Sequence, residues 1–326
     1  GGTNVRYIFQ RINPEVFRDI PGLMENVERT TEHLHLKQRE AGIEDTSRRS
    51  LTLLPSRDGG AFHEDDDGGI WRSYIFIERA RTYDVFTSDD QAYAGARAFG
   101  NFQKLLADLP APSLNVTIPG FHDGLARFAA FQAAVQADER NRARSARREI
   151  DFLEENAAIF ERVPRLLENG GIPERATHND CKMSNVMIDD ATGVGICVID
   201  LVTVMPGLVL YDFGDMVRTS TSSAPEDALD LSQVEMEIQR FEALARGYIS
   251  SAGDFLTDAE RDLLVFSGKL MTLIIGTRFL TDYLRGDVYF KTHRPGHNLD
   301  RCRTQFQLLR SITKQEEAMN RIVASL

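Results

Sequence analysis

The chain has 326 residues, of which 42% are hydrophobic, and it carries a formal net charge of −11 at pH 7. This length and apolar content predict one large domain or two domains and exclude a disordered or fibrous chain. The negative charge argues against nucleic acid as a partner, and no apolar run reaches the about 20 residues that a membrane helix needs. No signal peptide is recognisable, and the three cysteines lack metal or disulfide spacing, so we expect a soluble cytoplasmic protein without a membrane partner.

The first part of the chain reads mainly as strands around one helix. Residues 5–12 (VRYIFQRI) alternate and are rich in β-branched and aromatic side chains, which predicts a strand. Apolar residues recur at helical spacing over residues 23–36, which predicts a helix. Two more strands are expected within residues 50–60 and 70–78, joined by an acidic, glycine-rich connection at residues 63–69.

The pattern becomes helical after residue 77, with one short β element at residues 193–201. The arginine-rich segment 140–148 is interleaved with acidic residues, so we interpret it as a solvated helix face. Helices are predicted over residues 91–109, 125–169, 233–250 and 257–285. The sequence therefore predicts an α+β protein with a β-rich lobe of residues 1–79 and a larger, mainly helical lobe of residues 80–326.

The stretch HNDCKMSNVMIDD, residues 178–190, carries polar side chains at a spacing typical of phosphoryl transfer. Such a site needs a carboxylate at the acceptor hydroxyl and oxygen ligands for magnesium. Asp180 would be the base, Asn185 a magnesium ligand, and Lys182 a contact to the transferring phosphate. His178 would brace the loop. The alternative is a solvated loop before a strand.

A second magnesium ligand is expected at Asp200, which follows a buried strand at residues 196–199. Two protein ligands suffice, because magnesium also takes phosphate oxygens. The string Asp212-Phe213-Gly214 imitates a kinase metal motif but does not follow the strand that pairs with the catalytic loop. We therefore expect Asp212 to brace the loop or cap a helix, with substrate binding as its alternative role.

The pieces HNDCKMSN, CVIDL and YDFGD make the chain resemble the aminoglycoside phosphotransferase and choline kinase superfamily. The resemblance implies a two-lobed, protein-kinase-like fold. Within the superfamily the chain is most similar to N-acetylhexosamine 1-kinases, through blocks that include YIFQRIN, LMENVERTTEHL and GTRFLTDYLRGDVYF. This similarity implies a kinase that uses ATP and Mg²⁺ to phosphorylate a hydroxyl of an amino sugar. In the leading interpretation this hydroxyl is the anomeric one.

The resemblance also implies roles in the small lobe. Gln10 or Arg11 would contact the nucleotide phosphates, and Glu25 or Glu28 on the following helix would be the partner of that residue. The backbone of the hinge would meet adenine, and this hinge consists of Phe76, Ile77 and Glu78.

In the large lobe, the resemblance implies that Arg278 and Tyr289 line the acceptor pocket, where polar donors suit a sugar. Three features depart from the family pattern. Val202 stands where relatives commonly have a second carboxylate, no glycine-rich loop precedes YIFQRIN, and the C-terminal segment has Met319 in place of an aromatic residue that could stack on a sugar. Val202 and the missing glycine-rich loop motivate one alternative, a pseudokinase that binds ligand without turnover. The other alternative is a kinase for a cationic alcohol of the aminoglycoside or choline type, which an acidic protein would attract.

Overall fold

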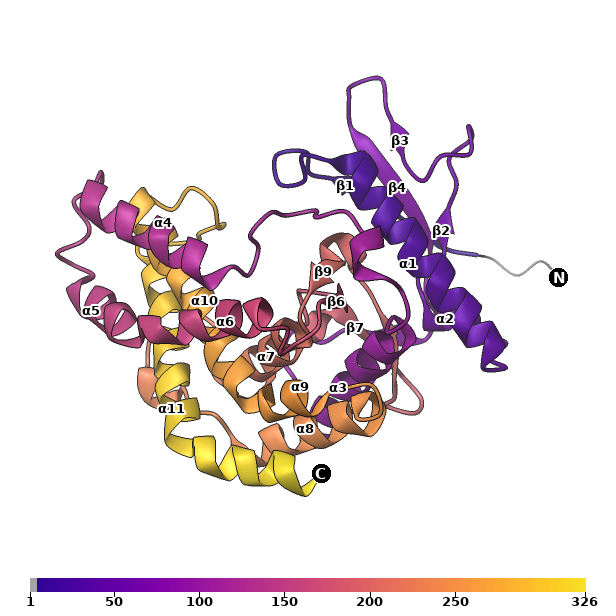
Figure 1. Cartoon of the computed structure of the whole chain (residues 1–326). Helices are drawn as coiled ribbons and strands as arrows, with labels where there is room; N and C mark the ends of the chain where they lie inside the picture. The colour runs from indigo at the N-terminus through magenta and orange to yellow at the C-terminus, as the bar shows by residue number, and fades with distance from the viewer. Residues whose placement is uncertain (1–4) are drawn as a thin grey trace.

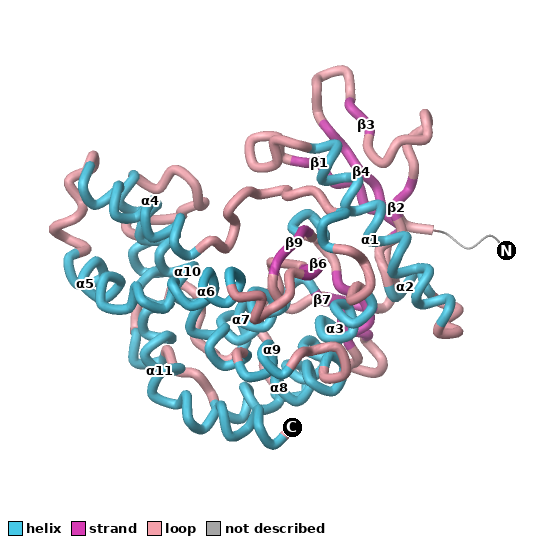
Figure 2. The backbone as a smooth tube through the Cα atoms, viewed as in Figure 1, coloured by secondary structure: helices cyan, strands magenta, loops and turns pink. Residues whose placement is uncertain are grey.

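The computed structural model describes residues 5–326 and has the predicted two-lobed α+β architecture. A small antiparallel sheet with one long helix forms one lobe, and a mostly helical region forms the other (Figure 1). The strands are concentrated in the small lobe and where it meets the helical lobe (Figure 2).

The small lobe is built on the antiparallel pairing of β1 (Tyr7–Ile12) with β4 (Ile70–Ile75). Two short strands, β2 (Leu53–Leu54) and β3 (His63–Glu64), also pair with β4, so part of the expected 63–69 connection is a strand. Helix α1 (Ile20–Glu40) packs its apolar side against this sheet, which confirms the helix predicted for residues 23–36 and extends it at both ends. A short helix, α2 (Thr46–Arg49), follows α1.

A second sheet begins just after the predicted lobe boundary. Strand β5 (Ala80–Arg81) pairs with β7 (Val186–Asp189), which pairs with β8 (Gly195–Val198). We propose that residues 1–79 and 80–326 form the two lobes, a division supported by the start of the second sheet at Ala80. A third pairing joins β6 (Arg175–Thr177) to β9 (Met205–Gly207).

The helical lobe is organised around packed pairs of helices. Helix α3 packs on α8, and α10 packs on both α7 and α11. The helices of this lobe are α3 (Asp89–Leu105), α4 (Gly124–Ala137), α5 (Arg147–Asn156), α6 (Arg162–Glu168), α7 (Val209–Ser220), α8 (Ile238–Ala252), α9 (Asp258–Asp262), α10 (Leu264–Arg285) and α11 (His297–Ser325).

Helix α10 is the only helix in residues 5–326 whose length and composition would allow it to cross a membrane. Its most apolar window is 89% buried inside the protein, which is the behaviour of a core helix. The burial of α10 against α7 and α11 accounts for its apolar sequence without a bilayer.

One prediction for the helical lobe was wrong. The single helix expected over residues 125–169 is divided into α4, α5 and α6, because Asp138 has a left-handed backbone (φ 35°) and its carboxylate accepts the backbone N–H groups of Arg142 and Ala143. Met319, which stands in place of an aromatic residue, is buried on α11 with 0% exposure. A residue at this position faces the core and cannot stack on a sugar.

Candidate active site

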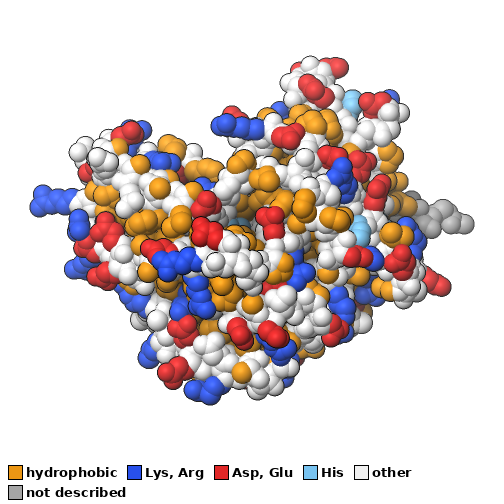
Figure 3. Space-filling model, in the orientation of Figure 1, with side chains coloured by type: hydrophobic (Ala, Val, Ile, Leu, Met, Phe, Trp, Pro, Cys, Tyr) orange, Lys and Arg blue, Asp and Glu red, His pale blue; other side chains and the backbone are white. Residues whose placement is uncertain are grey.

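A cleft of about 780 Å³ is lined by seven of the predicted site residues. The surface is visibly hollowed between the two lobes in Figure 3. The cleft is lined by three groups of predicted residues, Gln10 and Arg11 from β1, Asp180, Lys182 and Asp200 from the catalytic region, and Arg278 and Tyr289 from α10 and the loop after it.

Asp212 anchors the loop of residues 178–185, called the catalytic loop because it contains the proposed base Asp180. Asp212 is fully buried on α7, and its carboxylate accepts the backbone N–H of His178 at 2.9 Å and that of Asn179 at 2.6 Å. It also accepts Nε2 of Gln103 at 2.6 Å, and burial raises its pKa. Substrate binding, the alternative role for Asp212, is therefore wrong, because the carboxylate is enclosed and does not line the cleft.

His178 connects the catalytic loop to the segment that delivers Asp200. Its Nδ1 accepts the backbone N–H of Asp180 at 3.3 Å, so Nε2 carries the proton and donates to the carbonyl of Ile199 at 2.9 Å. The ring is fully buried and lies edge-on to Phe99 and Phe102. We propose that His178 is a brace that does not touch the reacting groups.

Asp180 faces the cleft with two donors on its carboxylate. Nζ of Lys182 lies 3.0 Å from Oδ2, and Nδ2 of Asn185 lies 3.1 Å from the same atom. Burial opposes ionisation of Asp180, but the Lys182 ammonium and the donated hydrogen bonds outweigh it and lower its pKa. Asp180 is therefore a carboxylate at neutral pH, the form that can accept a proton.

We propose that Asn185 and Asp200 would supply oxygen ligands to a magnesium ion near Asp180. Asn185 donates through Nδ2 to both the backbone and the side chain of Asp180, which leaves its Oδ1 available. Asp200 lies two residues beyond β8 in a left-handed conformation (φ 60°) that turns the chain. No group of three or more His, Cys, Asp or Glu residues within 5–326 is arranged to hold a metal, so an ion here would take further ligands from water or phosphate oxygens.

The small lobe departs from expectation at the predicted partner of the phosphate-binding residue. Glu25 makes no hydrogen bond or ion pair with β1 among the described residues, and its carboxylate instead accepts from Arg29 at 2.5 Å and from Asn115 at 2.8 Å. The pairing of Glu25 with Gln10 or Arg11 is therefore wrong. Gln10 instead accepts Nε of Arg72 at 3.2 Å, and Arg72 also lines the cleft.

The residues of the proposed hinge are not among those that line the cleft. Ile77 is buried, and the guanidinium of Arg6 covers the ring of Phe76 at 3.8 Å. The carbonyl of Glu78 accepts Nε of Arg48 at 3.2 Å. Because the Glu78 carbonyl is already paired with Arg48, we propose that adenine is recognised by other backbone groups of the hinge.

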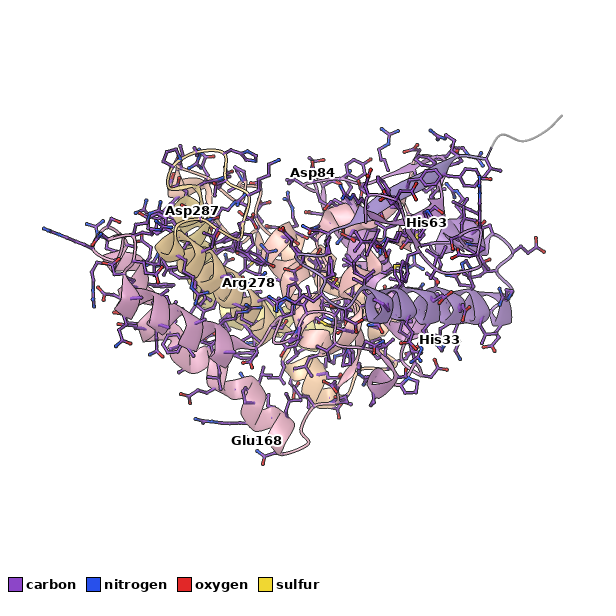
Figure 4. All side chains as sticks on the ribbon, turned by 90° about the horizontal axis from the view of Figure 1, so that it is seen from above. His33, His63, Asp84, Glu168, Arg278 and Asp287 are labelled. Atoms are coloured by element: carbon purple, nitrogen blue, oxygen red, sulfur yellow. The ribbon has the colours of Figure 1, made fainter. Side chains whose placement is uncertain are left out.

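The acceptor side of the cleft centres on Arg278. Its guanidinium lies 5.0 Å from the ring of Phe121, 5.7 Å from that of Tyr289 and 5.4 Å from that of Phe290. Burial lowers the pKa of Arg278. Asp282 shapes the adjoining loop by accepting the backbone N–H groups of residues 288, 289 and 290 at 2.9–3.0 Å. Figure 4 shows Arg278 near the middle of the molecule, between Asp287 and His63.

The cleft brings together an ionised carboxylate, Asp180, a second carboxylate, Asp200, and several cationic side chains, which are the kinds of groups that phosphoryl transfer uses. A family model for the phosphotransferase enzyme family matches residues 59–248, more than half of the chain, and the protein belongs to this family.

The fold is shared with solved structures at low sequence identity. An aminoglycoside phosphotransferase from Alicyclobacillus acidocaldarius subsp. acidocaldarius is 14% identical with a TM-score of 0.57, and the match covers 98% of this chain and 86% of the other. A microcompartment-associated aminopropanol kinase is 16% identical with a TM-score of 0.55, over 97% and 87% of the two chains. An amicoumacin kinase solved with AMP-PNP, Ca²⁺ and its ligand is 14% identical with a TM-score of 0.58, over 92% and 81%.

Proposed function

We propose that the protein transfers the γ-phosphate of ATP to a hydroxyl of an amino sugar such as an N-acetylhexosamine, at the anomeric position. The observation that carries this proposal is that Asp180 and Arg278 line the same cleft. One supplies a base for a hydroxyl, and the other supplies hydrogen-bond donors for an oxygen-rich acceptor.

The proposed reaction is an in-line displacement. The carboxylate of Asp180 takes the proton of the acceptor hydroxyl while that oxygen bonds to the γ-phosphorus, and the bond from phosphorus to the ADP oxygen breaks. Lys182, 3.0 Å from Asp180, keeps this carboxylate ionised and places a positive charge beside the phosphate. A magnesium ion held by Asn185 and Asp200 would supply charge neutralisation on the phosphate oxygens when bound.

The charges around the acceptor side support a neutral acceptor over a cationic one. Arg278 is accompanied by Lys291, Arg301 and Arg218, and the carboxylate that lines this side is Glu226. Glu226 lies 3.0 Å from Arg218 and 3.8 Å from Arg301, so its charge is already neutralised. An ammonium group would meet repulsion here, whereas sugar hydroxyls and an acetamide carbonyl could accept hydrogen bonds.

An acceptor panel tests the proposal. The protein is incubated with ATP and Mg²⁺ and with N-acetylglucosamine, N-acetylgalactosamine, an aminoglycoside or choline, and products are followed by mass spectrometry. We expect a sugar phosphate that is lost in Asp180→Asn. Phosphorylation of choline or the aminoglycoside alone would refute the amino-sugar assignment and leave the cationic-acceptor kinase.

Binding without turnover is the second candidate, and Val202 is the observation that favours it. Val202 lines the cleft two residues after Asp200, where a second carboxylate would stand. If the protein is a pseudokinase for this reason, it binds ATP without forming product, and Val202→Asp restores transfer. Turnover by the wild-type protein would eliminate this candidate.

A further inference from the structure

Arg72 is a buried cation at the small-lobe side of the cleft. It lies on β4 directly opposite Gln10 of β1, and its side chain is 4% exposed. The residue nevertheless lines the cleft together with Asp180 and Asp200. The guanidinium is therefore buried in the small lobe but lies at the same cleft as Asp180 and Asp200.

The guanidinium of Arg72 has donors that the protein leaves unused. Nε donates to Oε1 of Gln10 at 3.2 Å, and Nη2 lies 4.0 Å from Oδ1 of Asp200, too far for a hydrogen bond. Nη1 is buried and has no hydrogen-bond partner among residues 5–326. The ring of Tyr74 supports the guanidinium from 5.3 Å. A buried cation with unpaired donors is costly, which indicates that an anionic oxygen ligand completes this environment.

We infer that Arg72 is the phosphate-binding cation of the nucleotide site, supplied by β4, with Gln10 on β1 orienting it. This inference rests on the proposed kinase function and changes the role of β1, whose Gln10 or Arg11 was the expected phosphate contact. Gln10 carries no charge and is occupied by Arg72, and Arg11 has an exposed side chain. A guanidinium suits this task, because its fork of N–H donors matches phosphate oxygens.

Nucleotide binding at a series of phosphate lengths tests the assignment. ATP, ADP, AMP and adenosine are titrated by calorimetry, with Mg²⁺ present, into the wild-type protein and into Arg72→Met, Arg72→Lys and Arg11→Met. We expect Arg72→Met to weaken ATP about 10- to 100-fold, the range for a lost charge-assisted hydrogen bond. Adenosine affinity should stay within about threefold, because the contact is to phosphate.

The remaining variants separate a phosphate contact from a structural role. Arg72→Lys should recover part of the ATP affinity, and Arg11→Met, which tests the other cation on this side of the cleft, should lose less ATP affinity than Arg72→Met. Equal loss of ATP and adenosine in Arg72→Met would show a structural residue and overturn the inference. Wild-type ATP affinity in Arg72→Met would overturn it too while leaving the kinase proposal intact. Failure of the wild-type protein to bind any nucleotide would overturn both.

Discussion

The two sides of the cleft are built differently. In the catalytic loop, His178 and Asn179 are 0% and 2% exposed, and their backbone N–H groups are held by a buried carboxylate. In the loop on the acceptor side, Val288 and Tyr289 are 71% and 59% exposed. The groups proposed for chemistry are therefore fixed by a buried network, whereas part of the proposed acceptor site lies on a surface loop, where sequence changes cost little stability.

The largest expected effect comes from removing the base on the buried side. Asp180→Asn should lower kcat about 10²- to 10⁴-fold, because the amide cannot take the proton of the hydroxyl. ATP affinity should change little. The matched control is Asp190→Asn, which alters an exposed carboxylate paired with Arg81. Steady-state kinetics with the accepted sugar measures the effect, and a kcat within about threefold of wild type would remove Asp180 from the mechanism.

The next largest effect is expected from Asp212, whose carboxylate holds the backbone of the catalytic loop. Asp212→Ala leaves three buried N–H donors without an acceptor and should lower the free energy of unfolding by about 3 kcal/mol. Asp254→Ala, at a side chain 85% exposed, should cost less than about 0.5 kcal/mol. Urea unfolding followed by circular dichroism compares the two variants. An equal loss of unfolding free energy in the two variants would contradict the distinction between a buried and an exposed side of the site.

Arg278 is half-buried on the acceptor side, so its removal should have an intermediate effect. Arg278→Met should raise the KM of the sugar about 10- to 100-fold without changing ATP affinity, through the loss of charged hydrogen bonds. Arg285→Met, on the same helix with an exposed contact to the carbonyl of Ala130, is the control. Improved turnover of choline in Arg278→Met would agree with repulsion of cationic acceptors by Arg278. An unchanged KM for the sugar would contradict a role of Arg278 in sugar binding.

The Lys182 ammonium links chemistry to pH. Burial raises the pKa of Asp180, and Lys182 is the first group that opposes this effect, so the pKa is lowered in the wild-type protein. In Lys182→Met this opposing charge is lost, so the pKa of Asp180 rises above its wild-type value, and the acid limb of the kcat profile should move to higher pH. Lys291→Met, another lysine of the cleft, should leave that limb in place.

The smallest effect is expected on the exposed loop. The hydroxyl of Tyr289 is 3.4 Å from Nη2 of Arg278, a long contact at a side chain open to water. Tyr289→Phe should raise the KM of the sugar no more than about threefold. A change of more than about tenfold would place Tyr289 in direct contact with the acceptor and weaken the contrast between the two sides.

Local patterns predicted the residues of the catalytic loop and the strand that ends before Asp200. This was feasible because Asp180 and Asn185 are close in the chain and their geometry follows from one turn. The left-handed turn at Asp138 could not be distinguished from a continuing helix, since apolar residues continue at helical spacing on both sides. The long helix α11 was also missed, because its polar residues outweigh its buried ones in a short window.

Contacts between distant segments account for the other omissions. Arg72 was not singled out because its relation to Gln10 depends on the register of β1 against β4, which the sequence does not state. The sequence pattern that could have identified Arg72 is the alternation of side chains between the two faces of β4, which places this arginine on the inward face. Glu25 was misassigned for a similar reason, since its partner Asn115 comes from a segment far along the chain.

The measurement that tests the central claim most directly is a one-pot competition between N-acetylglucosamine and choline. Both are present at equal concentration with ATP and Mg²⁺, and both phosphates are quantified by mass spectrometry in the wild-type protein and in Asp180→Asn. The account predicts sugar phosphate as the main product of the wild-type protein and its loss in the variant. Choline phosphate as the main product, or equal sugar phosphate from the variant, would contradict it.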